Sequence, residues 1–119
     1  MSRKRFTFPK SRRLTKPVEF EQVRRNGRAE RGRLIVLSVL PIEDRQLRAG
    51  FITSRAVGSA VKRNRVRRKL REIVRNHQHE LNPGNWIVTI ARANAATARY
   101  EQLEGEWLRL AKRASILGA

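Results

Sequence analysis

The chain has 119 residues, of which 28 are Lys or Arg and 10 are Asp or Glu, so its formal net charge is +18. This length suits one domain with a modest core, and the absence of cysteine excludes a disulfide scaffold and a zinc–thiolate site. No apolar run approaches a membrane span and no apolar segment follows the basic N-terminus, so we expect a cytoplasmic protein with no membrane partner. An excess of positive charge this large indicates a polyanionic partner, which is usually a phosphate backbone.

The positive charge is concentrated in two segments. Residues 1–33 hold 12 basic and three acidic side chains, and residues 54–76 hold nine and one. Residues 34–53 and 77–119 are close to neutral. Arginine outnumbers lysine, which suits bidentate contact with phosphate and stacking on bases. The distribution favours a nucleic-acid-binding protein over a generically basic one.

The N-terminal third begins with a basic stretch and continues into a helix. Residues 1–13 are basic and include Phe6, Phe8 and Pro9, and we expect them to form an extended or partly disordered, flexible arm. Thr15 can cap the helix and Pro17 suits its first turn. The helix is expected to run to about Asn26 and to end at Gly27.

Two apolar segments then predict strands. Residues 34–40 form a continuous apolar run, typical of a strand that is covered on both faces. Residues 47–53 read as the next strand, and a hairpin between the two is the economical pairing. Residues 28–33 can hold a further short strand.

The most distinctive segment is residues 62–71, in which seven of ten side chains are basic. Apolar residues recur here at helical spacing and fall on one arc, which consists of Val66, Leu70, Ile73, Val74 and His77. The opposite side carries Asn64, Arg65, Arg68, Arg71 and Arg75. Ser59 can cap this helix, which we expect over residues 60–79. Because only Glu72 interrupts the cations, the pattern predicts a buried apolar face and an exposed row of positive charge, and not an ordinary mixed-charge surface.

The remaining segments complete an α+β order. Residues 86–91 predict a strand and residues 97–117 a last helix, with Trp86 and Trp107 expected in the core. The order is helix, two or three strands, basic helix, strand, helix. It predicts a single domain over residues 1–119, with one small sheet and helices packed against it.

Catalytic and metal sites find little support in the sequence. His77 and His79 are two residues apart, which is not the spacing that puts two ligands on one helical face. There is no cysteine nucleophile, no glycine-rich phosphate loop and no paired-carboxylate site. The chain therefore offers few of the acidic side chains that acid–base or two-metal catalysis by the protein would require. A Ser-His-Asp arrangement stays open, although no motif indicates one.

The segment from Gly58 to Glu72 resembles the signature of the bacterial ribonuclease P protein subunit. Its core is Arg63-Asn64-Arg65, followed by an apolar residue and further basic residues. The similarity extends over almost the whole chain and includes Phe8-Pro9, Arg13-Leu14, Phe20, Val23, Gly27 and the segments 47–51 and 86–92.

The resemblance implies the fold and the partners. The fold would be the family's ribosomal-protein-like α-β-β-(β)-α-β-α domain, in which the basic helix joins two parallel strands by a left-handed crossover, a rare hand. The chain would be the accessory subunit of an endoribonuclease whose RNA subunit uses Mg²⁺ to remove the 5′ leader of precursor tRNA. The implied partners are ribonuclease P RNA and precursor tRNA, with no obligate protein partner. No catalytic residue and no metal ligand are expected in this chain.

The resemblance also places candidate RNA contacts. The signature helix contributes Lys62, Arg63, Asn64, Arg65, Arg67, Arg68 and Arg71, and the other candidates are Lys69, Arg55, Arg12 and Arg13. The single-stranded leader is expected in a cleft between the first helix and the sheet, where Phe20 matches a base-stacking position and Val36 a strand position. Core packing is the alternative role for both. Arg24 and Ser38 stand where family members often carry aromatic residues, which weakens the stacking platform.

Three other functions compete with this one. A ribosomal or architectural RNA-binding protein without a role in cleavage would share the basic surface. A protein-only nuclease is disfavoured because acidic residues are few. A membrane-surface peptide is disfavoured by the core-like segments 34–40 and 86–91.

Overall fold

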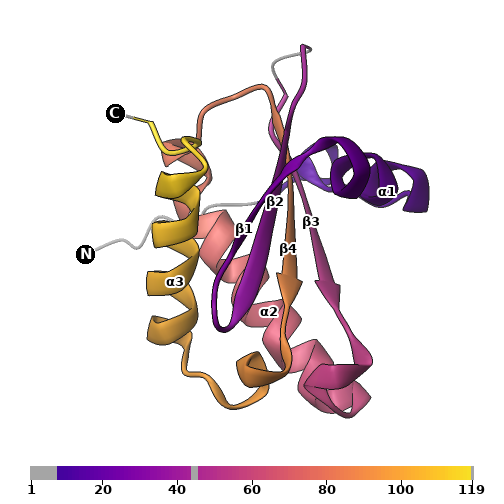
Figure 1. The fold of residues 1–119 in the computed structure, drawn as a ribbon, viewed down its shortest axis with the longest axis vertical. Helices are drawn as coiled ribbons and strands as arrows, with labels where there is room; N and C mark the ends of the chain where they lie inside the picture. Colours follow the sequence, from indigo (N-terminus) through magenta and orange to yellow (C-terminus); the bar gives the residue numbers. More distant parts are fainter. Residues whose placement is uncertain (1–7, 44–45, 119) are drawn as a thin grey trace.

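A single four-stranded mixed sheet organises the part of the chain that the computed structural model describes, residues 8–43 and 46–118 (Figure 1). From one edge to the other, its strands are β1 (Arg28–Arg31), β2 (Ile35–Pro41), β4 (Asn85–Ala91) and β3 (Arg48–Thr53). β2 runs antiparallel to β1 and β4, whereas β3 and β4 are parallel. This is the predicted α+β class, with the optional extra strand present.

The hairpin predicted between segments 34–40 and 47–53 is wrong. β2 pairs with β1 and β4, and β3 lies beyond β4 at the far edge of the sheet. The hairpin partner of β2 is the short strand β1, with Arg28 opposite Val39 and Arg31 opposite Val36. A nearly continuous apolar strand is best placed inside a sheet, with a partner on each side, and this non-local gain outweighs the short connection to β3.

The basic helix α2 (Ala60–His77) connects the parallel strands β3 and β4. In Figure 1 both strands point downwards, α2 lies behind the sheet and the chain passes from right to left, which makes the crossover left-handed. The Lys62 backbone N–H donates to Ser59 Oγ at 3.3 Å, so the predicted cap is confirmed. α2 ends two residues earlier than predicted, because Gln78–Glu80 forms a 3₁₀ turn.

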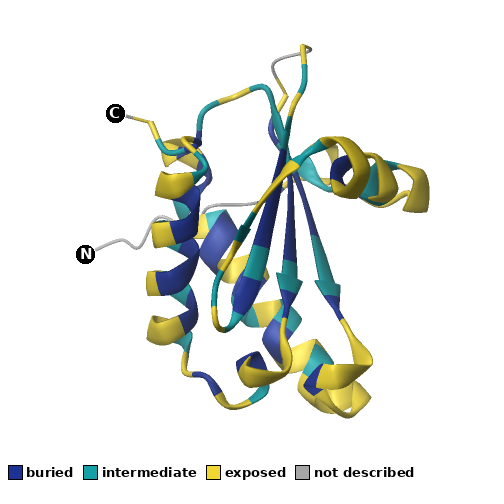
Figure 2. Cartoon of the chain, viewed as in Figure 1, coloured by how far each residue is buried: buried dark blue, intermediate teal, exposed yellow. Residues whose placement is uncertain are grey.

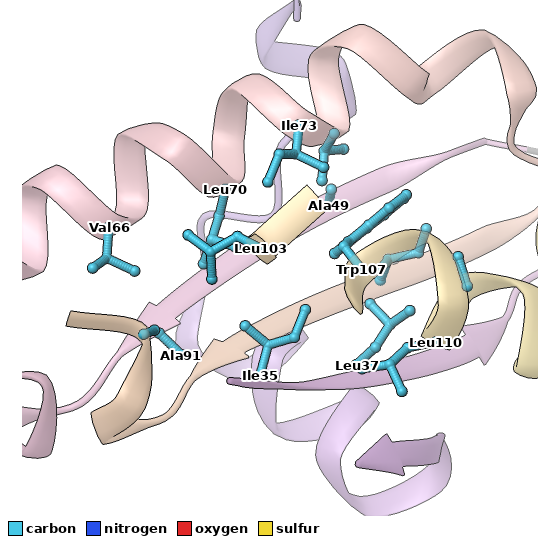
Figure 3. Packing of buried hydrophobic residues seen from close by; sticks show 14 of the residues in the cluster. Ile35, Leu37, Ala49, Val66, Leu70, Ile73, Ala91, Leu103, Trp107 and Leu110 are labelled. Carbon is cyan, nitrogen blue, oxygen red and sulfur yellow. The ribbon is translucent and has the colours of Figure 1, made fainter. Parts of the chain in front are cut away.

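The main core lies between the sheet and the helices α2 and α3 (Tyr100–Arg113) (Figure 3). Its fully buried side chains include Ile35, Leu37, Val66, Leu70, Ile73, Val74, Leu103, Trp107 and Leu110. Four of the five residues in the predicted apolar arc of α2 are therefore core residues, and His77 at its end is half-buried. The Trp107 indole N–H donates to Thr89 Oγ1 at 3.2 Å, which satisfies the one polar atom of that ring.

Helix α1 (Pro17–Asn26) packs on the opposite face of the sheet. It forms a smaller core in which Leu14, Val23 and Val88 are buried together. The helix ends against β2, where a Cβ on Gly27 would lie 2.4 Å from the Val23 carbonyl oxygen and 2.8 Å from that of Val39. Only glycine allows this close approach, which fixes how α1 crosses the sheet.

The stretch before α1 is ordered against the sheet over the residues that the structure describes. Phe8 is buried, Lys10–Arg12 forms a 3₁₀ turn, and the Leu14 backbone N–H donates to the Ala49 carbonyl at 2.9 Å. Residues 8–13 thus differ from the flexible arm expected for 1–13, because an aromatic side chain anchors them. Residues 1–7 lie outside the described residues. In the described part of the chain, no helix is both long and apolar enough to cross a membrane.

Candidate nucleic-acid interface

The sheet face that carries α1 is only partly covered. Directly opposed residues share a face, so three rows of side chains can be followed across the strands. The first row is Arg48, Trp86 and Leu40; the second is Gly50, Val88, Ser38 and Ala29; the third is Ile52, Ile90, Val36 and Arg31.

Helix α1 crosses the second row and leaves the third open. The ring of Phe20 covers Gly50, where a Cβ would lie 2.5 Å from the ring, and Val23 is fully buried beside Val88. Beyond the helix, Ile52, Ile90 and Val36 stay half-exposed, and Figure 2 shows the change from buried to intermediate near the arrow ends of β3 and β4. We call these three residues the cleft floor.

Basic and aromatic side chains meet at the β3 edge of this face. A cavity of about 240 Å³ is lined by Arg13, Leu14, Thr15, Phe20, Gly50, Phe51, Arg67 and Arg71. Three of these residues carry guanidinium groups and none carries a carboxylate. Burial and then the neighbouring charges of Arg13 and Arg67 lower the pKa of Arg71. The cavity, which we call the edge cavity, is therefore a place where an anion relieves electrostatic repulsion.

Hydrogen bonds to uncharged acceptors position two of these arginines. Arg13 donates to the Phe8 carbonyl at 2.8 and 3.1 Å. Arg67 donates to Thr53 Oγ1 at 2.7 Å and to Asn64 Oδ1 at 3.4 Å. Because none of these acceptors carries charge, the guanidinium groups keep their full positive charge for a ligand.

A half-buried ion pair holds α1 at this edge. The Arg48 guanidinium pairs with Glu19, donates to the Arg13 carbonyl at 2.8 Å and lies 5.3 Å from the Trp86 ring centre. Burial raises the pKa of Glu19, but hydrogen bonds from the Lys16 and Thr15 backbone and from Arg48 outweigh it and lower the pKa overall. The pair joins the start of α1 to β3 and so sets the position of Phe20.

The outward side of α2 presents cations without carboxylate partners. Lys62, Arg65 and Arg68 are exposed. Within the part of the chain that the structure describes, the only ion pair of the α2 residues before His77 joins Arg75 to Glu72 at 3.6 Å. Lys69 differs from this row, because its ammonium group donates to the Ala98 carbonyl at 3.2 Å on the α3 side. The predicted cationic row is thus confirmed, and it faces away from the core.

The sequence-predicted candidates fall into separate places. Phe20, Arg13, Arg67 and Arg71 come together at the edge cavity, and Val36 lies on the cleft floor. Ser38 is 5% exposed in the row beneath α1, so its side chain is enclosed by protein. Arg24 is exposed on α1, 3.8 Å from Glu21. Phe20 is therefore not joined by an aromatic side chain at position 24 or at position 38.

Two of the predicted basic residues lie away from the cleft, and several cleft residues were missed. Arg12 donates to buried Gln78 at 2.6 Å, and Arg55 lies in the 3₁₀ turn before α2. Ile52, Ile90 and Phe51 were not singled out. Strand alternation gives the faces of Ile52 and Ile90, but only the observed strand order brings them beside Val36.

His77 connects α2 to α3 and is not part of the cleft. Its Nδ1 contacts Glu80, its Nε2 lies 3.0 Å from Glu104, and its ring stacks on Trp107 with centroids 6.4 Å apart. Burial lowers the pKa of His77, but the two carboxylates outweigh burial and raise it overall. Within residues 8–43 and 46–118, no cluster of three or more His, Cys, Asp or Glu side chains could hold a metal ion.

The chain is similar to known proteins over most of its length. A family model described as Ribonuclease P matches residues 8–115. The ribonuclease P protein component of Herpetosiphon aurantiacus is 36% identical over 107 residues, which cover 90% of this chain and 87% of that protein. The protein of the same name from Chloroflexus aurantiacus is 39% identical over 108 residues, or 90% of this chain and 80% of that protein. Among solved structures, the RNase P protein of Staphylococcus aureus has the same fold, with a TM-score of 0.84 at 24% identity over 92% of this chain and all of that one.

Proposed function

The chain belongs to the bacterial ribonuclease P protein family, the protein subunits of the enzyme that processes tRNA 5′ ends, and we propose that two of its surfaces divide the RNA contacts. The edge cavity and cleft floor hold the single-stranded 5′ leader of precursor tRNA. The outward side of α2 contacts the catalytic RNA. Family membership removes the ribosomal and architectural alternatives.

The edge cavity carries the first half of this proposal. It combines the half-buried ring of Phe20 with three guanidinium groups, and Ile52 of the cleft floor follows Gly50 on the same face of β3. Unpaired bases stack on aromatic rings and contact apolar side chains, while guanidinium groups bind the backbone phosphates. A duplex hides its bases within the helix, so this combination suits a single strand.

The exposed cations of α2 support the second half. The helix has 18 residues and is therefore about 27 Å long, enough to lie along several phosphates. Arg65 and Arg68 point away from the cleft and have no carboxylate contact among the described residues. Contact with a folded RNA releases condensed counterions and depends steeply on salt.

Within this division the protein assists the chemistry electrostatically. We assign leader cleavage, with its Mg²⁺ requirement, to the RNA subunit, and place the complex in the cytoplasm. The protein lowers the repulsion between an anionic substrate and an anionic ribozyme. Its benefit is therefore greatest at low Mg²⁺ and modest salt.

The test is the effect of Phe20→Ala on leader recognition by the reconstituted holoenzyme. Stacking of one base contributes about 1–3 kcal/mol, so affinity for precursor tRNA should fall roughly fivefold or more while affinity for mature tRNA stays unchanged. Phe20→Leu keeps an apolar side chain over Gly50 and should show the same selective loss. Val18→Ala removes an exposed apolar side chain from the same helix and should change neither affinity. Equal losses for precursor and mature tRNA would reassign Phe20 to the core.

A further inference from the structure

Arg31 lies at the end of the cleft that is furthest from the edge cavity. It is opposite Val36, which is opposite Ile90, which is opposite Ile52. The cleft floor is therefore continued, one strand further on, by an arginine at the β1 edge of the sheet.

The neighbours of Arg31 fix the direction of its side chain. Glu30 points to the α3 side, where its carboxylate lies 3.8 Å from Arg113. Gly32 also faces that side, because a Cβ there would lie 2.5 Å from the Glu106 carboxylate. Side chains alternate along a strand and Arg31 is paired with Val36, so the Cβ of Arg31 lies on the face of α1 and the cleft floor. At the sheet edge the residue also borders a cavity that Glu106 and Arg109 line on the α3 side.

Arg31 is also free to bind an anion. It is exposed and makes no hydrogen bond or ion pair with any residue the structure describes. Arg28 on the same strand is also exposed, but it pairs with Glu30 at 3.0 Å and lies on the α3 side. The two arginines thus form a natural pair for comparison.

The width of the sheet separates Arg31 from the edge cavity. Three strand spacings lie between β3 and β1, or roughly 14 Å. A single-stranded leader that crosses this floor therefore has at least one nucleotide between the phosphate at the edge cavity and the phosphate at Arg31.

Building on the proposed function, we propose that Arg31 binds a backbone phosphate of the leader at the far end of the cleft floor. The leader is then held at two points, by the edge cavity near Phe20 and by Arg31 at the opposite edge of the sheet. A guanidinium–phosphate contact carries no sequence information, so Arg31 senses the length of the leader and not its bases.

The test measures holoenzyme affinity for precursor tRNAs whose leaders increase one nucleotide at a time. With the wild-type protein, affinity should rise until the leader reaches Arg31. With Arg31→Ala the rise should stop at a shorter leader, and the salt slope for a long leader should fall by about 0.7, the value for one phosphate of a single strand. Arg31→Lys should keep the wild-type salt slope. Arg28→Ala, which removes the same charge from the opposite face, should follow the wild type.

Two results would overturn the role of Arg31. One is the same salt slope and length dependence for Arg31→Ala as for Arg28→Ala. The other is an equal loss for mature tRNA, which would mean a contact with the ribozyme or the tRNA body. A leader-selective loss for Phe20→Ala alongside either result would leave the proposed cleft standing. Equal losses of affinity for precursor and mature tRNA in both variants would remove the proposed function itself.

Discussion

The two faces of the sheet differ in how far helices cover them, although they share the same four strands. On one face, α2 and α3 cover the central strands, and Ile35, Leu37 and Ile87 are inaccessible to solvent. On the other face, α1 covers one row and leaves Val36, Ile52 and Ile90 half-exposed. Each of these six side chains is apolar, so composition alone does not distinguish the core from the cleft.

The difference arises from which helices are available to cover each face. α2 and α3 pack large apolar side chains onto the sheet, whereas α1 contributes only Val23 and Phe20 to its face. A short helix with so small an apolar side leaves part of the sheet uncovered. In a chain with net charge +18, an uncovered apolar floor beside guanidinium groups is suited to bind unpaired RNA.

The largest contrast between the faces should appear in stability. Leu70→Ala removes a fully buried side chain from the covered face and should lower the free energy of unfolding by about 2–5 kcal/mol. Val36→Ala removes a half-exposed side chain from the cleft floor and should cost less than about 1 kcal/mol. Urea unfolding of the free protein measures both. Similar losses would show that the cleft floor is ordinary core.

At the edge cavity we expect a smaller effect, which changes RNA binding and not protein stability. Arg71→Ala should weaken precursor tRNA binding by the holoenzyme roughly tenfold, the cost of one charge-assisted hydrogen bond. It should not lower protein stability, because Arg71 is held near Arg13 and Arg67, whose like charges lower its pKa together with burial. Arg25→Ala, on the outer side of α1, is the charge-matched control. A destabilised Arg71→Ala protein would contradict an anion site at this position.

The smallest expected effect is on the pH dependence of unfolding and comes from His77, which lies on the covered face. Its folded-state pKa is raised above about 6.5 by Glu80 and Glu104, so the charged ring stabilises the fold at low pH. That contribution should be fully present below about pH 6.5 and should disappear as the pH rises through the folded-state pKa. His77→Gln should remove this pH dependence of unfolding and leave leader affinity unchanged. A wild-type stability that does not fall over that range would show that the carboxylates do not hold the proton.

The sequence could predict features that depend on local periodicity and missed those that depend on non-local pairing. The 3.6-residue spacing of Val66, Leu70 and Ile73 identified the buried side of α2, and Ser59 identified its start. Local patterns did not give the strand order, because a parallel partner for β3 requires a crossover through α2 that no local turn signal encodes. Only the family resemblance implied that the basic helix joins two parallel strands.

The cleft was only partly predictable for the same reason. The three arginines of the edge cavity come from the segment before α1 and from two turns of α2, and only the fold brings them beside Phe20. Arg31 could be assigned a face only after the register of β1 was known. Ser38 was expected in the cleft, but α1 covers its row.

The division of RNA contacts between cleft and helix can be tested most directly by site-specific crosslinking. The chain has no cysteine, so one introduced cysteine can carry a photoreactive group at a single place. Val36→Cys on the cleft floor should crosslink to the leader of bound precursor tRNA, and Arg65→Cys on α2 should crosslink to the catalytic RNA. Crosslinks from Val36→Cys to the catalytic RNA, or from Arg65→Cys to the leader, would contradict the division.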